Sequence, residues 1–163
     1  MILAIIFDLD GTLVDLPVDW EALFDELKRV MHVDNVRPLT VTIPRTDLQT
    51  RKKAFDAWSK AELAVVKNVI INEEGMKIYR ESQNRPKALV TMQGKKTAER
   101  ILDQLKLKFD VVVTREDSLS REKQLLKAVE KLDIPARDIL FVGDAESDAT
   151  AAQKTGCQFR RIE

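Results

Sequence analysis

Short apolar runs and helical patterns alternate through the second half of the chain. The runs at residues 88–90, 109–113 and 139–142 are rich in Val, Ile and Leu and show no regular polar alternation. Strands buried on both faces of a parallel sheet have this composition, because neither face meets water. A similar run at residues 2–7 predicts one further strand, and a weaker run at residues 157–162 predicts another.

Helices are predicted between the later strands, because apolar residues recur there at spacings of three and four. They fall at residues 95–106, 120–132 and 145–154, and Gly156 stands just beyond the last, where glycine commonly ends a helix. Regular alternation of strand and helix is typical of doubly wound α/β domains. We therefore predict a doubly wound, Rossmann-like parallel sheet as the core of the fold.

Residues 16–86 interrupt this alternation with helical patterns alone. Apolar residues recur at helical spacing after Asp19, again after Asp47, and once more within residues 73–83. Both tryptophans lie in this stretch, which contains no convincing strand. It predicts a small all-helical cap inserted after the first strand. The expected domains are a core at residues 1–15 and 87–163 and a helical cap at residues 16–86.

Composition excludes several classes of partner. Lys and Arg number 27, as do Asp and Glu, so the formal net charge is zero and no overall field attracts nucleic acid or an anionic membrane. No apolar stretch approaches the length of about 18 residues that a membrane span needs. Cys157 is the single cysteine, which excludes an internal disulfide and fits a cytoplasmic setting. We expect no nucleic acid partner and no membrane partner.

The first acidic motif follows the run at residues 2–7. Asp8 and Asp10 are two residues apart in what is predicted to be extended chain, so their side chains point the same way. Two carboxylates in one crevice repel each other unless a cation or a proton lies between them. Gly11 then allows a sharp turn. An ordinary turn after a strand is the alternative interpretation of the same residues.

The second acidic motif follows the run at residues 139–142. Asp144 and Asp148 are four residues apart, about one helical turn. Asp144 also suits a helix N-cap, which is the alternative interpretation. Because the carboxyl ends of parallel strands meet at one edge of the sheet, we expect both acidic pairs to lie close together. Several carboxylates with room for water are the ligands that Mg²⁺ prefers, so Mg²⁺ is the predicted cofactor.

Together these motifs resemble those of the haloacid dehalogenase superfamily of phosphohydrolases. The family's first motif, DxDGT, matches residues 8–12, and its GDxxxD motif matches Gly143, Asp144 and Asp148. A Ser or Thr ends the next core strand in the family, and Thr91 has that place here. The family's lysine near a helix start corresponds to Lys123, with Arg121 as a competitor, since this chain lacks the usual Lys-Pro pair.

The resemblance implies a role for each matched residue. Asp8 is the expected nucleophile, forming an aspartyl-phosphate, and Asp10 the general acid and base. Thr91 and Lys123 are expected to bind the phosphoryl group. The expected ligands of Mg²⁺ are Asp8, the backbone carbonyl of Asp10, Asp144 and Asp148.

The predicted activity is hydrolysis of a small phosphorylated metabolite. Dehalogenases of the superfamily lack an aspartate at the position of Asp10, so its presence favours a phosphatase or a phosphomutase. A phosphomutase of the same superfamily remains an alternative, as does a non-catalytic binding protein that kept the fold. His32 and the basic run from Arg45 to Lys53 are interpreted as solvated or packed surface residues, although the basic run is also a candidate anion site.

Overall fold

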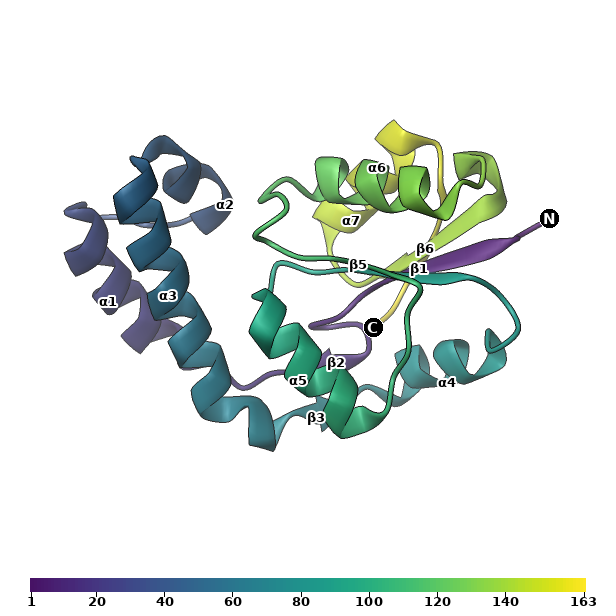
Figure 1. The fold of residues 1–163 in the computed structure, drawn as a ribbon, viewed down its shortest axis with the longest axis horizontal. Coiled ribbons are helices and arrows are strands. Elements are labelled where there is room, and N and C mark those ends of the chain that lie inside the picture. Colours follow the sequence, from purple (N-terminus) through teal and green to yellow (C-terminus); the bar gives the residue numbers. More distant parts are fainter.

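The computed structural model describes residues 1–163 and contains a five-stranded sheet in which every neighbouring pair is parallel (Figure 1). The strand order is β5-β4-β1-β6-β7, with β1 in the centre. The predicted doubly wound α/β core is confirmed, including the weak C-terminal strand. The strands are β1 (Ala4–Asp8), β4 (Lys87–Val90), β5 (Val111–Val113), β6 (Ile139–Gly143) and β7 (Gln158–Arg161).

Helices cover both faces of this sheet. Helices α6 (Arg121–Leu132) and α7 (Glu146–Thr155) pack on one face, while α4 (Glu73–Glu81) and α5 (Lys95–Leu105) pack on the other (Figure 1). Successive side chains of a strand point to opposite faces. Ile6 therefore joins the apolar cluster under α6 and α7, whereas Phe7 joins the cluster under α4 and α5.

A separate group of helices lies beyond the carboxyl ends of the strands (Figure 1). It consists of α1 (Trp20–Met31), the short α2 (Leu39–Thr42) and η1 (Ile43–Arg45), and α3 (Leu48–Val65). We call residues 20–65 the helical lobe. Its buried apolar side chains form a cluster of their own around Leu27, Ile43 and Trp58, distinct from the two clusters that flank the sheet.

The chain enters and leaves the helical lobe through a small two-stranded ladder. Strands β2 (Val14–Asp15) and β3 (Ile70–Ile71) pair antiparallel, with η2 (Val66–Asn68) just before β3. The prediction that residues 16–86 contain no strand is therefore wrong for β3, which is too short to show a pattern. The domain boundary at residue 86 stays a prediction. Helix α4 packs with the sheet through Met76, Ile78 and Tyr79, which favours a cap that ends before α4.

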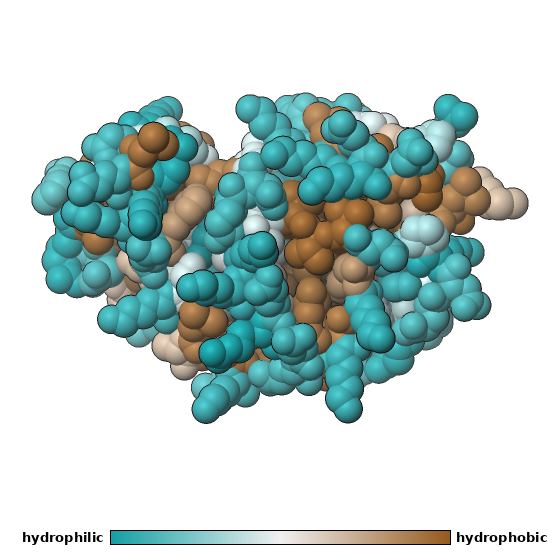
Figure 2. Space-filling model, in the orientation of Figure 1, coloured by the Kyte–Doolittle hydropathy of each residue, from teal (hydrophilic) through white to brown (hydrophobic).

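The face of the molecule in Figure 2 is mainly polar, and an apolar strip crosses it along the edge strand of the sheet. Figure 2 shows apolar side chains gathered between α5 and α6, where edge strand β5 runs, with polar side chains over the helices on either side. The last short helix, η3 (Ala136–Asp138), leads into β6. No helix of the chain combines the length and the apolar character that crossing a membrane requires.

Candidate active site

Strand pairing brings the two acidic motifs together at the carboxyl ends of the strands. In the register of the sheet, Asp8 stands opposite Val90 of β4, and Phe7 stands opposite Val142 of β6. The residues that follow these strands, Thr91 and Asp144, therefore flank Asp8. The carboxyl end of the sheet faces the helical lobe (Figure 1). In open α/β sheets, ligands bind at this end.

Two glycines allow the close approach of these segments. Gly11 has a φ of +85°, and a Cβ atom there would collide with the Asp144 carboxylate. At Gly143 a Cβ atom would lie 2.5 Å from Oδ2 of Asp148. A larger residue at either position would displace the neighbouring carboxylate. The close packing of the two acidic motifs therefore requires glycine at both positions.

Three carboxylates form a group that can hold a metal ion. Asp8, Asp144 and Asp148 each place one oxygen within 4.8 Å of the others. Asp148 is fully buried, and its Oδ2 accepts hydrogen bonds from the backbone N–H groups of Asp144 (3.2 Å) and Ala145 (3.1 Å). Because the N-cap of α7 is Ala145, the alternative interpretation of Asp144 as the N-cap is wrong.

The Asp8 carboxylate is buried among charges of both signs. Its Oδ1 accepts a hydrogen bond from the backbone N–H of Leu9 (2.8 Å) and one from Nη2 of Arg121 (3.0 Å). Burial raises the pKa of Asp8 well above its usual value, the Arg121 guanidinium lowers it, and the neighbouring Asp148 and Asp144 raise it again. The two hydrogen bonds fix the orientation of the Asp8 side chain. The carboxylates of Asp148 and Asp144 lie close enough to disfavour a negative charge on Asp8.

Asp10 and Asp8 line the same pocket. The Oδ1 of Asp10 accepts a hydrogen bond from the backbone N–H of Leu16 at 2.9 Å. Burial raises the pKa of Asp10 to about 6 against the opposing effect of that hydrogen bond. A carboxyl group with this pKa can both donate and accept a proton near neutral pH.

The structure places Arg121, and not Lys123, beside the predicted nucleophile. Ser120 is the N-cap of α6, so Arg121 is the first helical residue and faces the sheet edge. The Arg121 Nε lies 2.8 Å from Oδ1 of Asp148, and its Nη2 bonds Asp8. Lys123 is exposed and lines a different surface hollow. Two residues further along a helix correspond to a rotation of about 200°, which turns Lys123 away from the site.

A buried glutamine links Arg121 to the end of β4. The Gln124 Oε1 accepts a hydrogen bond from Arg121 Nη1 (2.8 Å), and its Nε2 donates to the backbone carbonyl of Thr91 (2.9 Å). The Thr91 Oγ1 accepts from the N–H of Gln93 at 3.0 Å, so its own proton is available to a ligand. Sequence reasoning missed Gln124, although its place one turn after Arg121 on the buried side of α6 was a usable signal.

The carboxylates open into a pocket of about 220 Å³ between the sheet edge and the helical lobe. The lobe contributes Trp20, Trp58 and Glu62, and the loop after β4 contributes Met92 and Gln93. Of the predicted site residues, Asp8, Asp10, Thr91 and Asp144 line the pocket, with Asp148 directly behind it. Residues of the lobe and the loop were not predicted, because no local pattern marks a side chain that meets the site only through tertiary packing.

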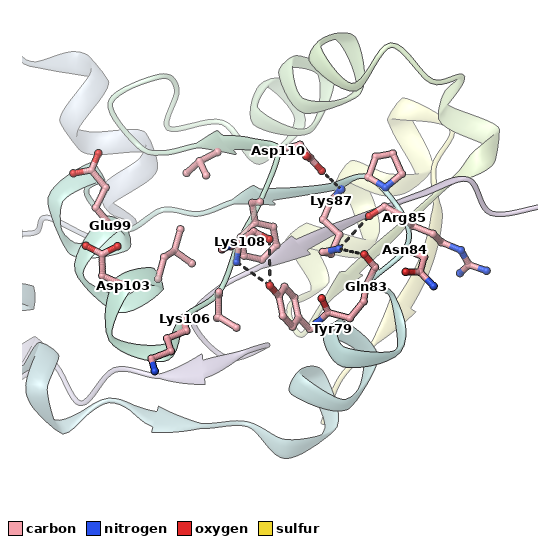
Figure 3. Close-up of a pocket in the computed structure, with 15 residues that line it drawn as sticks. Tyr79, Gln83, Asn84, Arg85, Lys87, Glu99, Asp103, Lys106, Lys108 and Asp110 are labelled. Carbon is pink, nitrogen blue, oxygen red and sulfur yellow. Dashed lines mark hydrogen bonds between the residues drawn. The ribbon is translucent and has the colours of Figure 1, made fainter.

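A larger hollow lies at the amino ends of the strands, and its polar groups are arranged differently from those of the acidic pocket. Figure 3 shows it at the amino ends of β4 and β5, with Tyr79 and Lys87 at its centre. The Lys87 Nζ donates to the backbone carbonyls of Ser82 and Arg85 (both 3.1 Å), and the Tyr79 hydroxyl accepts from the N–H of Lys108 (2.8 Å). Because Lys87 and Tyr79 already have hydrogen-bond partners in the surrounding backbone, we interpret the hollow as a structural junction.

Known structures with this arrangement share the fold at low identity. The chain superimposes on a haloacid dehalogenase-like family hydrolase from Streptococcus pneumoniae with a TM-score of 0.73 and 20% identity, over 99% of this chain and 85% of that one. A protein described as a predicted phosphatase from Clostridium acetobutylicum gives 0.69 and 21%, over 98% and 83%. L-2-haloacid dehalogenase from Xanthobacter autotrophicus gives 0.66 and 16%, over 99% and 78%.

These structural relatives include both phosphatases and dehalogenases by their descriptions, so they establish the fold alone. No curated protein matches the sequence. The family model for haloacid dehalogenase-like hydrolases, however, matches residues 5–162, nearly the whole chain. The protein therefore belongs to the haloacid dehalogenase-like hydrolase family.

Proposed function

We propose that the protein is a Mg²⁺-dependent phosphatase that hydrolyses the phosphomonoester of a small metabolite through Asp8. One observation carries the proposal: three carboxylate oxygens of Asp8, Asp144 and Asp148 lie within 4.8 Å of one another, beside the guanidinium of Arg121. A cation and an anionic phosphoryl group can therefore bind side by side against the nucleophile. Phosphoryl transfer to a carboxylate needs that neutralisation, because both reactants are negative.

The donor set fits Mg²⁺. Carboxylate oxygens are the ligands of a hard divalent cation, and the acidic group has more negative charge than Arg121 alone compensates. Asp8, Asp144 and Asp148, with the backbone carbonyl of Asp10, are the residues that would hold the ion. When bound, the ion neutralises charge on the phosphoryl group and lowers the repulsion that an attacking carboxylate meets.

Asp8 is the proposed nucleophile. The backbone N–H of Leu9 and the guanidinium of Arg121 donate to its Oδ1, and the Thr12 hydroxyl lies 3.5 Å from its Oδ2, so the carboxylate is held in the lining of the pocket. One carboxylate oxygen forms a bond to phosphorus as the bond from phosphorus to the leaving oxygen breaks, which yields an aspartyl-phosphate and an alkoxide. Water then attacks the phosphorus, and release of inorganic phosphate restores Asp8.

Asp10 is the proposed proton carrier of both steps. In its protonated form it delivers a proton to the leaving oxygen, and as a carboxylate it takes one from the attacking water. The hydrogen bond from Leu16 N–H holds this side chain in the lining of the pocket. Asp10 also supports a phosphatase over a dehalogenase, because a departing halide needs no proton.

Thr91 and Arg121 are proposed to bind the phosphoryl oxygens. The Thr91 hydroxyl has a proton free to donate, and Arg121 can shift a donor from Asp8 to the transferring group. Arg121 takes the role that the family resemblance gave to Lys123. A guanidinium is suited to it, since its planar donors match the oxygens of a phosphoryl group.

The test is Mg²⁺-dependent release of phosphate from p-nitrophenyl phosphate. We expect activity with Mg²⁺, none after chelation, and a fall in kcat of about 10⁴-fold or more in Asp8→Asn, because the nucleophile is lost. Asp103→Asn, the same change at an exposed site on α5, is the matched control. Activity that survives in Asp8→Asn would contradict the mechanism. A single burst of product, with turnover only when a sugar phosphate acceptor is added, would instead favour a phosphomutase.

A further inference from the structure

A second hollow lies between α3 of the helical lobe and the amino end of α5, which faces that helix (Figure 1). Its volume is about 740 Å³, inside the range of roughly 300–1,000 Å³ in which small molecules bind. No residue lines both this hollow and the pocket that contains Asp8. We call it the basic hollow, after its cationic lining residues Arg51, Lys52, Lys60, Lys95 and Lys96.

Helical periodicity forms the lobe side of the basic hollow. The lining residues of α3 recur every three or four positions from Leu48 to Leu63, so they occupy one face of the helix. Arg51 and Lys60, nine residues apart, are about 13.5 Å apart along the helix axis. Lys53 belongs to the same basic run of the sequence and is exposed, but it does not line the hollow.

The cations of the basic hollow are not compensated within the protein. Five of them face two carboxylates, Asp56 and Glu116. The Glu116 carboxylate already accepts from the Lys95 backbone N–H (3.0 Å) and the Thr114 hydroxyl (2.7 Å). None of the five cations forms an ion pair. The chain as a whole has a net charge of zero, so this local excess is not a result of a basic composition.

Arg51 is held in place by the lobe. It is half-buried, and its Nη2 donates to the backbone carbonyl of Pro44 at 2.9 Å. A carbonyl fixes the guanidinium without neutralising its charge. A guanidinium that is already oriented can bind phosphate oxygens through its remaining N–H groups with little further loss of freedom.

The basic hollow also has apolar lining residues, namely Leu48, Phe55 and Leu63. Leu48 is 79% exposed, so it has little apolar cover in the free protein. A single phosphate group cannot contact cations that are distributed over two helices and about 13.5 Å of α3. A chain of phosphates can do so, and an attached planar base would cover the apolar side chains. Both halves of the lining are then used.

We propose that the basic hollow binds a nucleoside triphosphate, with the phosphates on the cations of α3 and α5 and the base against Leu48 and Phe55. Because α3 belongs to the helical lobe and α5 packs on the sheet, the bound ligand would hold these two parts of the molecule together. The site is separate from Asp8, and the proposal does not depend on the proposed phosphatase activity.

The experiment is isothermal titration of the protein with ATP in the presence of a metal chelator. We expect saturable binding at one site with a Kd below about 1 mM. AMP keeps the base but has one phosphate, and inorganic tripolyphosphate keeps the charge but has no base. Each should bind at least about fivefold more weakly than ATP, because each uses only half of the lining.

Paired substitutions locate the site. Lys52→Met/Lys96→Met removes one cation from each side of the hollow and should raise the Kd for ATP by about tenfold or more. Lys53→Met/Lys77→Met is the matched control, since it removes the same charge at exposed positions outside the hollow and should change the Kd less than twofold. Leu48→Ser should reduce the advantage of ATP over tripolyphosphate and leave tripolyphosphate binding as in the wild type.

Thermal unfolding separates ligand binding from folding. Exposed cations without partners repel one another, so Lys52→Met/Lys96→Met should have a Tm no lower than that of the wild type. A large fall in Tm would show a structural role and would contradict the proposal.

The other outcomes are equally decisive. Equal rises in Kd in the two double variants would show unspecific attraction of charge, and equal affinities for ATP and tripolyphosphate would show that the base is not recognised. Either result would overturn the inference. Arg121→Met should leave ATP binding unchanged, and loss of binding there would place the nucleotide in the acidic pocket instead. Absence of saturable binding at about 1 mM ATP would also overturn the inference, while the phosphatase proposal would stand.

Discussion

Two groups of buried charges meet near the junction of the helical lobe and the sheet, and they differ in how completely their charges are compensated. Glu62 of α3 and Arg115, after β5, form a one-to-one ion pair at 2.9 Å, with exposures of 2% and 1%. Glu62 also accepts from Gly94 N–H and Thr97 Oγ1, while Arg115 also donates to Ser59 Oγ. At the carboxyl ends of β1 and β6, by contrast, three carboxylates lie together and Arg121 pairs with only two of them, Asp8 and Asp148, while Asp144 has no ion pair.

This difference in charge compensation separates a group that stabilises the fold, Glu62 and Arg115, from a group that is suited to bind a ligand. A buried pair with matched charge and additional hydrogen bonds is stable as it stands and needs no ligand. A group with excess negative charge gains most from a cation, so its free energy depends on what binds. Burial of charge alone therefore does not identify the site. What identifies it is the charge that the protein leaves uncompensated.

The largest effect is expected when one charge of the Glu62–Arg115 pair is removed, because the other charge is then buried without compensation. Arg115→Met leaves the Glu62 carboxylate buried without its cation, so we expect the free energy of unfolding to fall by about 3–5 kcal/mol. Urea unfolding measures the loss. In the double variant Glu62→Leu/Arg115→Met the total loss should be smaller than the sum of the two single losses. Additive losses would show that the two side chains do not act as a pair.

The second test asks which cation serves the acidic group. Arg121→Met should lower kcat/KM for an aryl phosphate by about 100-fold, because a donor to the transferring group is lost. Lys123→Met, the same kind of change two residues along α6, should alter it less than twofold, since Lys123 is exposed. Steady-state kinetics of the two variants shows whether Arg121 or Lys123 binds the transferring group. The reverse order of effects would return the phosphate-binding role to Lys123.

A smaller effect is expected from lowering the excess charge itself. Without Mg²⁺, Asp144→Asn should be at least as stable as the wild type, because repulsion among the carboxylates is relieved. With Mg²⁺ at ten times its Kd, the wild type should gain about 1.4 kcal/mol of unfolding free energy. The variant should gain less at the same concentration. Thermal unfolding with and without Mg²⁺ measures both, and an equal gain in the variant would remove Asp144 from the metal site.

The smallest effect concerns a carboxylate that lies outside both groups. Asp47 is an exposed N-cap whose Oδ1 accepts from Thr50 N–H at 2.7 Å, and that hydrogen bond lowers its pKa. A lowered folded-state pKa contributes stability above the unfolded value, and this contribution disappears as pH falls through the folded value. Asp47→Asn keeps a capping oxygen but does not titrate. Its unfolding free energy should therefore decline less steeply than the wild type's below about pH 4, and parallel curves would contradict this account.

The sequence predicted the sheet because buried parallel strands are continuously apolar, and it predicted Asp8 and Asp144 because both follow such strands. The phosphate-binding role of Lys123 stays a prediction, although the structure places Arg121 and not Lys123 beside Asp8. Leu125 and Ala128 are buried on α6, and Arg121 lies four residues before Leu125, on the same face. Anchoring the helix on that face would have selected Arg121.

Other features have no local signature. Strand β3 has two residues, Ile70 and Ile71, and is defined only by their pairing with Asp15 and Val14 of β2. Gln93 and Trp58 lie 35 positions apart in the sequence and line the same pocket only after the lobe has packed against the sheet.

The central position of β1 also has a consequence during synthesis. Strand β1 is made before its partner β6, and Thr12 Oγ1 lies 3.4 Å from an Asp144 oxygen, 132 residues away in the sequence. At about 5–20 residues per second, the ribosome needs roughly 7 to 26 seconds to add the second acidic segment after the first. A nascent chain that stops before β6 lacks Asp144 and Asp148, so the acidic group assembles only after β6 and the first turn of α7 have been translated.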